Sequence, residues 1–173
     1  MIVRWLAEKI AGAAPEGETG LLEAVRGNMP GKDGESVRIV AALTGLLGSI
    51  AYADRDYAAV EEERIRVELA RVEGLTAAGV QAILKVLREH IVSISTVEAP
   101  IYARELLDLV DRDFRFQVLE ALVDLAAADD EITVQETNVL RLTATALGLT
   151  QHDYNTCQSR YRDKLNVLRV RTV

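Results

Sequence analysis

Two stretches of this sequence share one pattern of residues and together decide its fold. The first, LTGLLGSIAYADRDYAAVEEERI, covers residues 43–65, and the second, VLEALVDLAAADDEITVQETNVL, covers residues 118–140. Each places apolar residues at the spacing of one helix face, then an acidic turn, then a second helical stretch. Each is followed by Gly-Leu-Thr, at 74–76 and 148–150. This self-similarity predicts a duplicated helical hairpin, although two unrelated alanine-rich hairpins would also look alike.

The spacing of apolar residues is helical over nearly all of residues 35–168, and no alternating run indicates a strand. Gly74 and Gly148 are placed to end helices, and Thr76 and Thr150 are placed to begin the next ones as N-caps. We therefore predict an all-α fold, a compact bundle of about seven helices with two pseudo-repeated hairpins. The predicted helices cover residues 36–53, 59–73, 77–93, 97–110, 113–128, 134–147 and 151–168.

The first 34 residues are expected to stand apart from this bundle. Residues 2–13 have the spacing of a short amphipathic helix, in which Trp5 is expected to dock on the body of the protein rather than on a membrane. Residues 14–34 are rich in glycine and proline and predict a linker. The predicted division is therefore an N-terminal helix and linker over 1–34 and a helical domain over 35–173.

Composition limits the classes of function. The chain has 173 residues, 27 acidic and 20 basic, and its net charge of −7 disfavours nucleic-acid binding. One cysteine, no secretory pattern and no apolar run long enough to span a bilayer predict a cytoplasmic protein. His90, His152 and Cys157 are too few for a zinc site of four Cys and His ligands within one chain. Any metal would be held mainly by oxygen.

Paired acids mark the turn of each hairpin. Asp54 and Glu61 are seven residues apart, as are Asp129 and Glu136, and each Asp continues the apolar stripe of the preceding helix. The helical spacing predicts that both pairs point toward the core, where repulsion and lost hydration would favour a bound Ca²⁺, Mg²⁺ or Mn²⁺. Helix capping is the alternative, because Thr133 and Glu136 match a capping box and Glu61 would favour the positive end of its helix.

The same pattern carries a family resemblance. A helix ending in Ala-Asp, a short acidic turn, an apolar residue, a capping position and a Glu resembles the ADGxhSPEE motif of the TerB-like tellurite-resistance family, over about residues 37–165. The resemblance implies a helical domain linked to bacterial tellurite resistance and stress response, with the paired acids as candidate metal ligands and no catalytic activity. The family glycine is replaced by Arg55 and by Asp130, and Arg55 could itself neutralise the first acidic pair.

These observations lead to one prediction of function and one alternative. We predict a non-enzymatic domain of a tellurite-resistance or stress-response system that binds partner proteins of a stress-response complex and a divalent cation at the acidic turns. The alternative is a pure interaction scaffold, or an adaptor like the related J-domain co-chaperones, whose acids only cap helices. Cys157 shares an apolar stripe with Tyr154 and Tyr161, which favours core packing over redox chemistry. The basic C-terminal residues, Arg162 among them, are interpreted as a solvated helix end.

Overall fold

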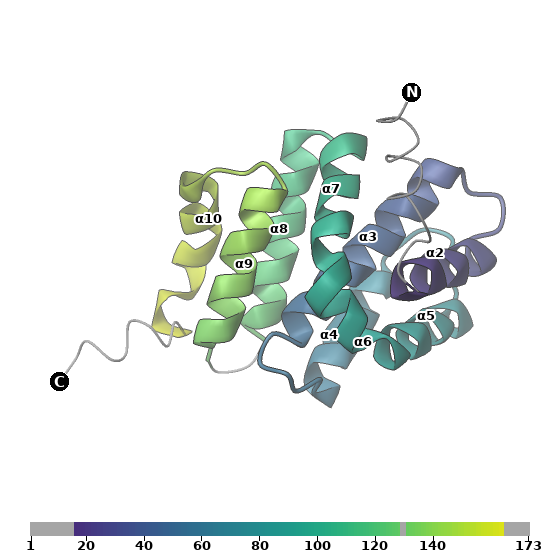
Figure 1. The fold of residues 1–173 in the computed structure, drawn as a ribbon, viewed down its shortest axis with the longest axis horizontal. Helices are drawn as coiled ribbons and strands as arrows, with labels where there is room; N and C mark the ends of the chain where they lie inside the picture. Colours follow the sequence, from purple (N-terminus) through teal and green to yellow (C-terminus); the bar gives the residue numbers. More distant parts are fainter. Residues whose placement is uncertain (1–15, 129–130, 165–173) are drawn as a thin grey trace, which may run out of the picture.

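The computed structural model describes residues 16–128 and 131–164, and within them the chain is helical with no β-strand. This confirms the all-α bundle expected from the helical spacing (Figure 1). The helices in chain order are α2 (Glu16–Asn28), α3 (Gly34–Ala51), α4 (Ala59–Ala70), α5 (Ala77–Glu89), α6 (Ile91–Ser93), the π-helix η1 (Ile94–Glu98), α7 (Ala99–Leu109), α8 (Arg112–Ala126), α9 (Val134–Ala146), α10 (Gln151–Gln158) and the 3₁₀-helix η2 (Ser159–Lys164).

The helix α3 is the centre of the bundle. It packs against α2, α7, η1 and α8, and nearly every residue from Val40 to Ala51 is buried. Two glycines allow this close packing, since a Cβ on Gly45 would lie 2.4 Å from the ring of Tyr102 and a Cβ on Gly48 would lie 2.5 Å from Leu87. A helix that is apolar on all sides has to be surrounded in this way.

The expectation that the chain has no apolar run of membrane-spanning length is wrong for α3. Its 18 residues are long and apolar enough to cross a membrane by length and composition, and 67% of them are buried inside the bundle. A core helix passes the same test. Burial against the surrounding helices accounts for the apolar character of α3.

Two three-helix units repeat along the chain. In the first repeat, α3, α4 and α5 contact one another, and in the second repeat α8, α9 and α10 do the same. Gly74 and Gly148 end the middle helices with φ of 95° and 69°, the left-handed conformation predicted for them. Thr76 and Thr150 each accept a hydrogen bond from the N–H three residues later, at 3.1 and 3.2 Å. The helix signals are confirmed, while superposition of the hairpins about a pseudo-twofold axis stays a prediction.

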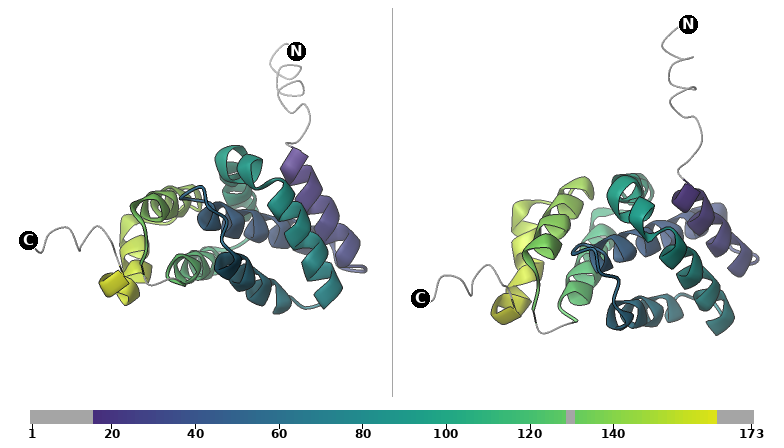
Figure 2. Two further views of the ribbon diagram at one scale, coloured as in Figure 1. Left: turned by 90° about the horizontal axis from the view of Figure 1, so that it is seen from below. Right: turned by 60° about the horizontal axis from the view of Figure 1, so that its bottom comes forward.

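The predicted linker over residues 14–34 is wrong for most of its length, because α2 occupies Glu16–Asn28. Leu21 and Val25 are fully buried, and α2 packs on both α3 and α5, which Figure 2 shows at one end of the molecule. Buried residues at helical spacing outweigh the helix-weakening effect of the glycines. The boundary at residue 35 therefore cuts through one core. Residues 1–15, with Trp5 and the predicted helix over 2–13, lie outside the described residues.

The segment between α5 and α7 contains a π-helix that the sequence does not reveal. Pro100 lies in the first turn of α7 and cannot donate to a carbonyl of the preceding turn, and η1 provides the wider turn directly before it. This places Glu98 in the core at 0% exposure. Its two carboxylate oxygens accept hydrogen bonds from the hydroxyls of Ser93 at 2.6 Å and Tyr102 at 2.8 Å.

The predicted last helix over 151–168 is shorter than expected in its α-helical part. α10 ends at Gln158, and the 3₁₀-helix η2 continues to Lys164. The backbone N–H of Ile132 donates to the carbonyl of Lys164 at 2.8 Å, and the Lys164 Nζ donates to the carbonyl of Ala127 at 2.9 Å. These bonds connect η2 to both sides of the second acidic turn.

Candidate functional site

The second acidic turn contains a complete capping box. Glu136 Oε2 accepts hydrogen bonds from the backbone N–H of Thr133 at 2.7 Å and from its hydroxyl at 2.8 Å, and the Glu136 N–H donates to Thr133 Oγ1 at 3.1 Å. Glu136 is 7% exposed, so a buried carboxylate satisfies donors at the start of α9 that the helix itself leaves unpaired. The capping role expected for Glu136 is confirmed. Asp129 and Asp130 lie outside the described residues, so the predicted Asp129–Glu136 pair is not placed.

The first acidic turn is built differently. Glu61 Oε2 accepts a hydrogen bond from the N–H of Ala58 at 3.0 Å, but Ala58 has no hydroxyl, so only half of the capping box exists. Asp54 is exposed and its Oδ1 accepts from the N–H of Asp56 at 2.9 Å. The prediction that Asp54 points toward the core is wrong, because α3 ends before it, with Tyr52 as its C-cap.

Arg55 adopts φ of 71°, a left-handed conformation that is uncommon outside glycine. It stands at the position of the glycine in the family motif, and glycine adopts this conformation without steric cost. Arg55 is exposed. Neutralisation of the first acidic pair by Arg55 stays a prediction.

Tyr57 and Ile132 occupy equivalent positions in the two turns, one residue before the N-caps. Ile132 is fully buried. The Tyr57 hydroxyl is also buried and, among residues 16–128 and 131–164, has no hydrogen-bond partner. Burial raises the pKa of Tyr57 strongly, and the nearby negative charge of Glu62 adds to this. Glu62 itself accepts a hydrogen bond from Arg88 Nε at 3.0 Å, which connects α4 to α5.

Cys157 lies in the core, as its apolar stripe predicts, at 2% exposure. Burial, helped by the negative charge of Glu120, raises the pKa of the Cys157 thiol to about 11. His90 is the half-buried C-cap of α5, and His152 is exposed in the first turn of α10. Within the described residues no group of three or more His, Cys, Asp and Glu side chains is arranged to hold a metal ion.

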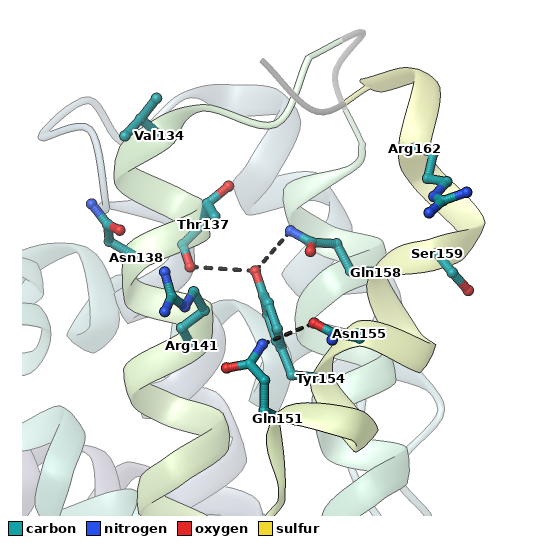
Figure 3. A pocket seen from close by; sticks show the side chains of 10 residues that line it. All are labelled: Val134, Thr137, Asn138, Arg141, Gln151, Tyr154, Asn155, Gln158, Ser159 and Arg162. Atoms are coloured by element: carbon teal, nitrogen blue, oxygen red, sulfur yellow. Dashed lines mark hydrogen bonds between the residues drawn. The ribbon is translucent and has the colours of Figure 1, made fainter. Parts of the chain in front are cut away.

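A polar groove of about 470 Å³ lies between α9 and the segment formed by α10 and η2 (Figure 3). Tyr154 lies between the two sides: its hydroxyl donates to the Thr137 carbonyl at 3.4 Å and accepts from Gln158 Nε2 at 2.7 Å. Burial raises the pKa of Tyr154 to about 12. Arg141 and Arg162 lie on opposite sides of the groove (Figure 3).

This groove is not evident from the sequence. Its only local signal is polar spacing: Asn138 and Arg141 share one face of α9, and Gln151, Asn155 and Gln158 share one face of α10. A solvent-exposed helix face gives the same signal. The two faces form one groove only because α9 and α10 pack together.

The comparison with known proteins agrees with the motif in the acidic turns. The family model described as "Tellurite resistance protein TerB" matches residues 40–159, from the middle of α3 to the end of α10. No curated protein and no solved structure is significantly similar to the chain. The match covers more than half of the chain and includes both repeats with both acidic turns. The chain therefore belongs to the TerB tellurite-resistance family.

Proposed function

We propose that this TerB-family chain is a non-catalytic helical domain that acts in the bacterial cytoplasm by holding partner proteins of a tellurite-resistance or stress-response complex. The observation that carries the proposal is the use of the two repeated glutamates. Glu61 and Glu136 both bind backbone N–H groups at the start of a helix. Carboxylates used in this way fix the turns of a rigid frame, which leaves the outer surfaces to make contacts with other molecules.

The state of the single cysteine supports a role without catalysis. A nucleophilic or redox-active cysteine needs a lowered pKa and access to solvent. Cys157 has the opposite properties, because it is 2% exposed and burial raises its pKa to about 11. A thiol in this environment packs as a small apolar side chain.

Exposed apolar side chains support a protein partner. Leu142 on α9 is 72% exposed, and Val92 and Val97 are 57% and 58% exposed. Val92 and Val139 of α9 line one cavity of about 460 Å³. A partner that covers such side chains gains roughly 25 cal/mol for each Å² of apolar surface removed from water.

A growth assay tests the proposal. Cells that lack this protein are supplied with the intact chain or a variant and grown on tellurite. Leu142→Asp should remove resistance, because it places a charge on the proposed partner surface, whereas Gln117→Asp on exposed α8 surface should keep it. Cys157→Ser should also keep it. Loss of resistance with a folded Cys157→Ser protein would show thiol chemistry and would overturn the non-catalytic role.

Binding of Ca²⁺, Mg²⁺ or Mn²⁺ at the second acidic turn is a second candidate, favoured by the burial of Glu136. Asp129 and Glu136 would be its ligands, and the exposure of Asp54 makes the pair with Glu61 the weaker site. A bound ion stabilises the native state by about 2.7 kcal/mol at a hundredfold excess over Kd.

Thermal melting at pH 7 with millimolar concentrations of each ion tests this second candidate. The ion should raise the melting temperature of the wild type. Asp129→Asn should remove most of the increase, whereas the matched change Asp54→Asn at the first turn should leave it. Unchanged melting temperatures with all three ions would rule out the cation site and leave the interaction role in place.

A further inference from the structure

The groove between α9 and α10 with η2 is lined by hydrogen-bond donors on exposed side chains. Arg141 on α9 and Arg162 on η2 flank it, the amides of Gln151 and Asn155 lie between them, and Asn138 lies beside Arg141 on α9 (Figure 3). Tyr154 is 3% exposed and lies at the bottom. None of the described residues that line the groove carries a carboxylate, although the net charge of the chain is −7.

The first repeat offers an internal comparison for Arg141. The equivalent residue is Arg66, 75 positions earlier, and its Nε donates to Glu63 Oε2 at 2.7 Å. Asn138 is the equivalent of Glu63 in the second repeat. The carboxylate that pairs with Arg66 is therefore replaced by an amide beside Arg141. Among the residues that the structure describes, neither Arg141 nor Arg162 takes part in an ion pair.

The cavities beside these two arginines also differ. The cavity between α4 and α5, lined by Arg66, Ala77 and Val80, has a volume of about 170 Å³. The groove in the second repeat has about 470 Å³, with Gln151 and Tyr154 at the positions of Ala77 and Val80. The second repeat therefore combines a larger space, more donors and an arginine without its acidic neighbour.

From this combination we infer that the groove binds a small organic anion with two oxyanion groups, carboxylate or phosphate, joined by a polar spacer. Guanidinium groups pair with oxyanions through charge-assisted hydrogen bonds, and the two arginines lie on opposite sides of the groove. The amides between them pair with the hydroxyl or carbonyl groups of the spacer. This ligand site is independent of the proposed partner surface and of the acidic turns.

The dimensions favour a small molecule over the other anions. A volume of about 470 Å³ lies in the range of small-molecule pockets, roughly 300–1,000 Å³, and greatly exceeds the space of one inorganic ion. The lining part of α9, from Val134 to Arg141, is roughly 10 Å long at about 1.5 Å per residue. An extended peptide would place only about three residues in that length at roughly 3.3 Å each.

Calorimetric titration of the full chain tests the proposal with four defined probes. Citrate represents a carboxylate ligand, fructose 1,6-bisphosphate a phosphate ligand, inorganic phosphate a single oxyanion, and the blocked tetrapeptide Glu-Gly-Gly-Glu an acidic peptide. We expect citrate or the bisphosphate to bind at least about tenfold more tightly than inorganic phosphate, because each additional oxyanion pair adds roughly one factor of ten.

Three single variants show whether the groove is responsible. Arg141→Gln should weaken the preferred probe by about tenfold, and Arg66→Gln, the same change at the equivalent position of the first repeat, should leave the affinity unchanged. Asn138→Glu reproduces the acidic neighbour of the first repeat and should weaken binding as much as Arg141→Gln while keeping both arginines. Asn138 and Arg141 are exposed and Arg66 is partly exposed, and unchanged melting temperatures would show that the variants are folded.

Each of the other results overturns the inference. Equal affinity for phosphate and the two-ended probes would show an adventitious ion only. Equal weakening by Arg66→Gln and Arg141→Gln would show attraction to general surface charge. Tighter binding of the tetrapeptide than of citrate and the bisphosphate would show that the groove binds an acidic peptide. If no probe binds with a Kd below the millimolar range, the groove does not bind this class of ligand.

Discussion

The two acidic turns share the same spacing of residues but differ in how they are stabilised. The second turn has a full capping box around a buried Glu136, with Thr133 supplying both an acceptor and a donor. The first has Glu61 alone bonding to the N–H of Ala58, and its Asp54 faces solvent. A repeat in sequence therefore preserves where helices begin and end, while the surroundings of each acid depend on neighbours that the repeat does not share.

The third helices of the repeats differ in a related way. α5 is covered by α2, which packs along it (Figure 2), and its apolar positions include Val80 and Ile83, both buried. The equivalent positions of α10 hold Tyr154 and Cys157, and the open groove lies beside α10. The first repeat has an additional helix packed on its third helix, and the second repeat has an open groove between its second and third helices.

The largest expected effect concerns α3, the first helix of the first repeat. Gly45→Ala should destabilise the protein by about 2–3 kcal/mol, because the added Cβ would lie 2.4 Å from the ring of Tyr102. Gly27→Ala in α2 is the matched control, since a Cβ there meets nothing within 4 Å. It should be neutral or stabilising by up to about 1 kcal/mol. Urea unfolding measures both, and equal effects would contradict the close packing of α3.

Substitutions at the N-caps of the two turns test this comparison directly. Thr133→Ala should cost about 1–2 kcal/mol, because it removes the hydroxyl that accepts from the Glu136 N–H. Ala58→Thr in the first turn should stabilise the protein by about 1 kcal/mol, because it supplies the missing half of the box beside Glu61. Unfolding free energies of the two variants provide the measurement. A gain smaller than about 0.3 kcal/mol for Ala58→Thr would show that the first turn cannot adopt the geometry of the second.

The pH dependence of stability should differ between the starts of the two third helices. Hydrogen bonds from the backbone and hydroxyl of Thr150 lower the pKa of Asp153, and Arg112 lowers it further. A lowered pKa gives stability that is present above the unfolded value, about 3.9, and is lost as the pH falls through the folded value. Gly79 occupies the equivalent place in α5 and cannot titrate. Asp153→Asn should therefore reduce the loss of stability in acid, as measured by melting from pH 7 to pH 2. An unchanged acid profile would contradict this role of Asp153.

Thiol labelling compares the inner positions of the third helices. Ile83 and Cys157 are equivalent and both are buried, and burial raises the pKa of Cys157 to about 11. Native protein at pH 8 should react slowly with a thiol reagent, since both thiolate population and access are low. An Ile83→Cys variant should react at a similarly slow rate. Fast stoichiometric labelling of the wild type would show that the second repeat opens readily, and it would bring a redox role back into consideration.

Local signals explain which parts of this molecule could be predicted from its sequence. Gly74 with Thr76 marks a helix end and the next start through backbone geometry that depends on a few neighbouring residues. The direction of Asp54 depends on where α3 stops, and Tyr52 ends it before the apolar stripe reaches the acid. The sequence does not predict α2, because its glycines are typical of a linker. The stability of α2 comes from the packing of Leu21 against other helices.

The groove could not be predicted from the sequence, because it depends on how two separate segments pack against each other. Arg141 comes from α9 and Arg162 from η2, 21 positions later, and each alone resembles an exposed basic residue. The informative signal is the comparison of Glu63 with Asn138, because it removes a partner from an arginine that both repeats retain. That difference becomes meaningful only once the structure shows that α9 and α10 enclose a space.

The smallest expected effects come from one buried hydroxyl in each repeat. Tyr57 Oη in the first turn and Thr137 Oγ1 in α9 are the buried side-chain polar atoms without a hydrogen-bond partner in the part of the chain that the structure describes. A buried hydroxyl that lacks a partner costs stability, so Tyr57→Phe and Thr137→Val should each be neutral or stabilising by up to about 1 kcal/mol. Urea unfolding of both variants and of the double variant measures this, with additive effects expected for sites in different repeats. A loss of more than about 1 kcal/mol for either variant would mean that its hydroxyl has a partner in solution, and for Thr137 that partner would lie at the groove.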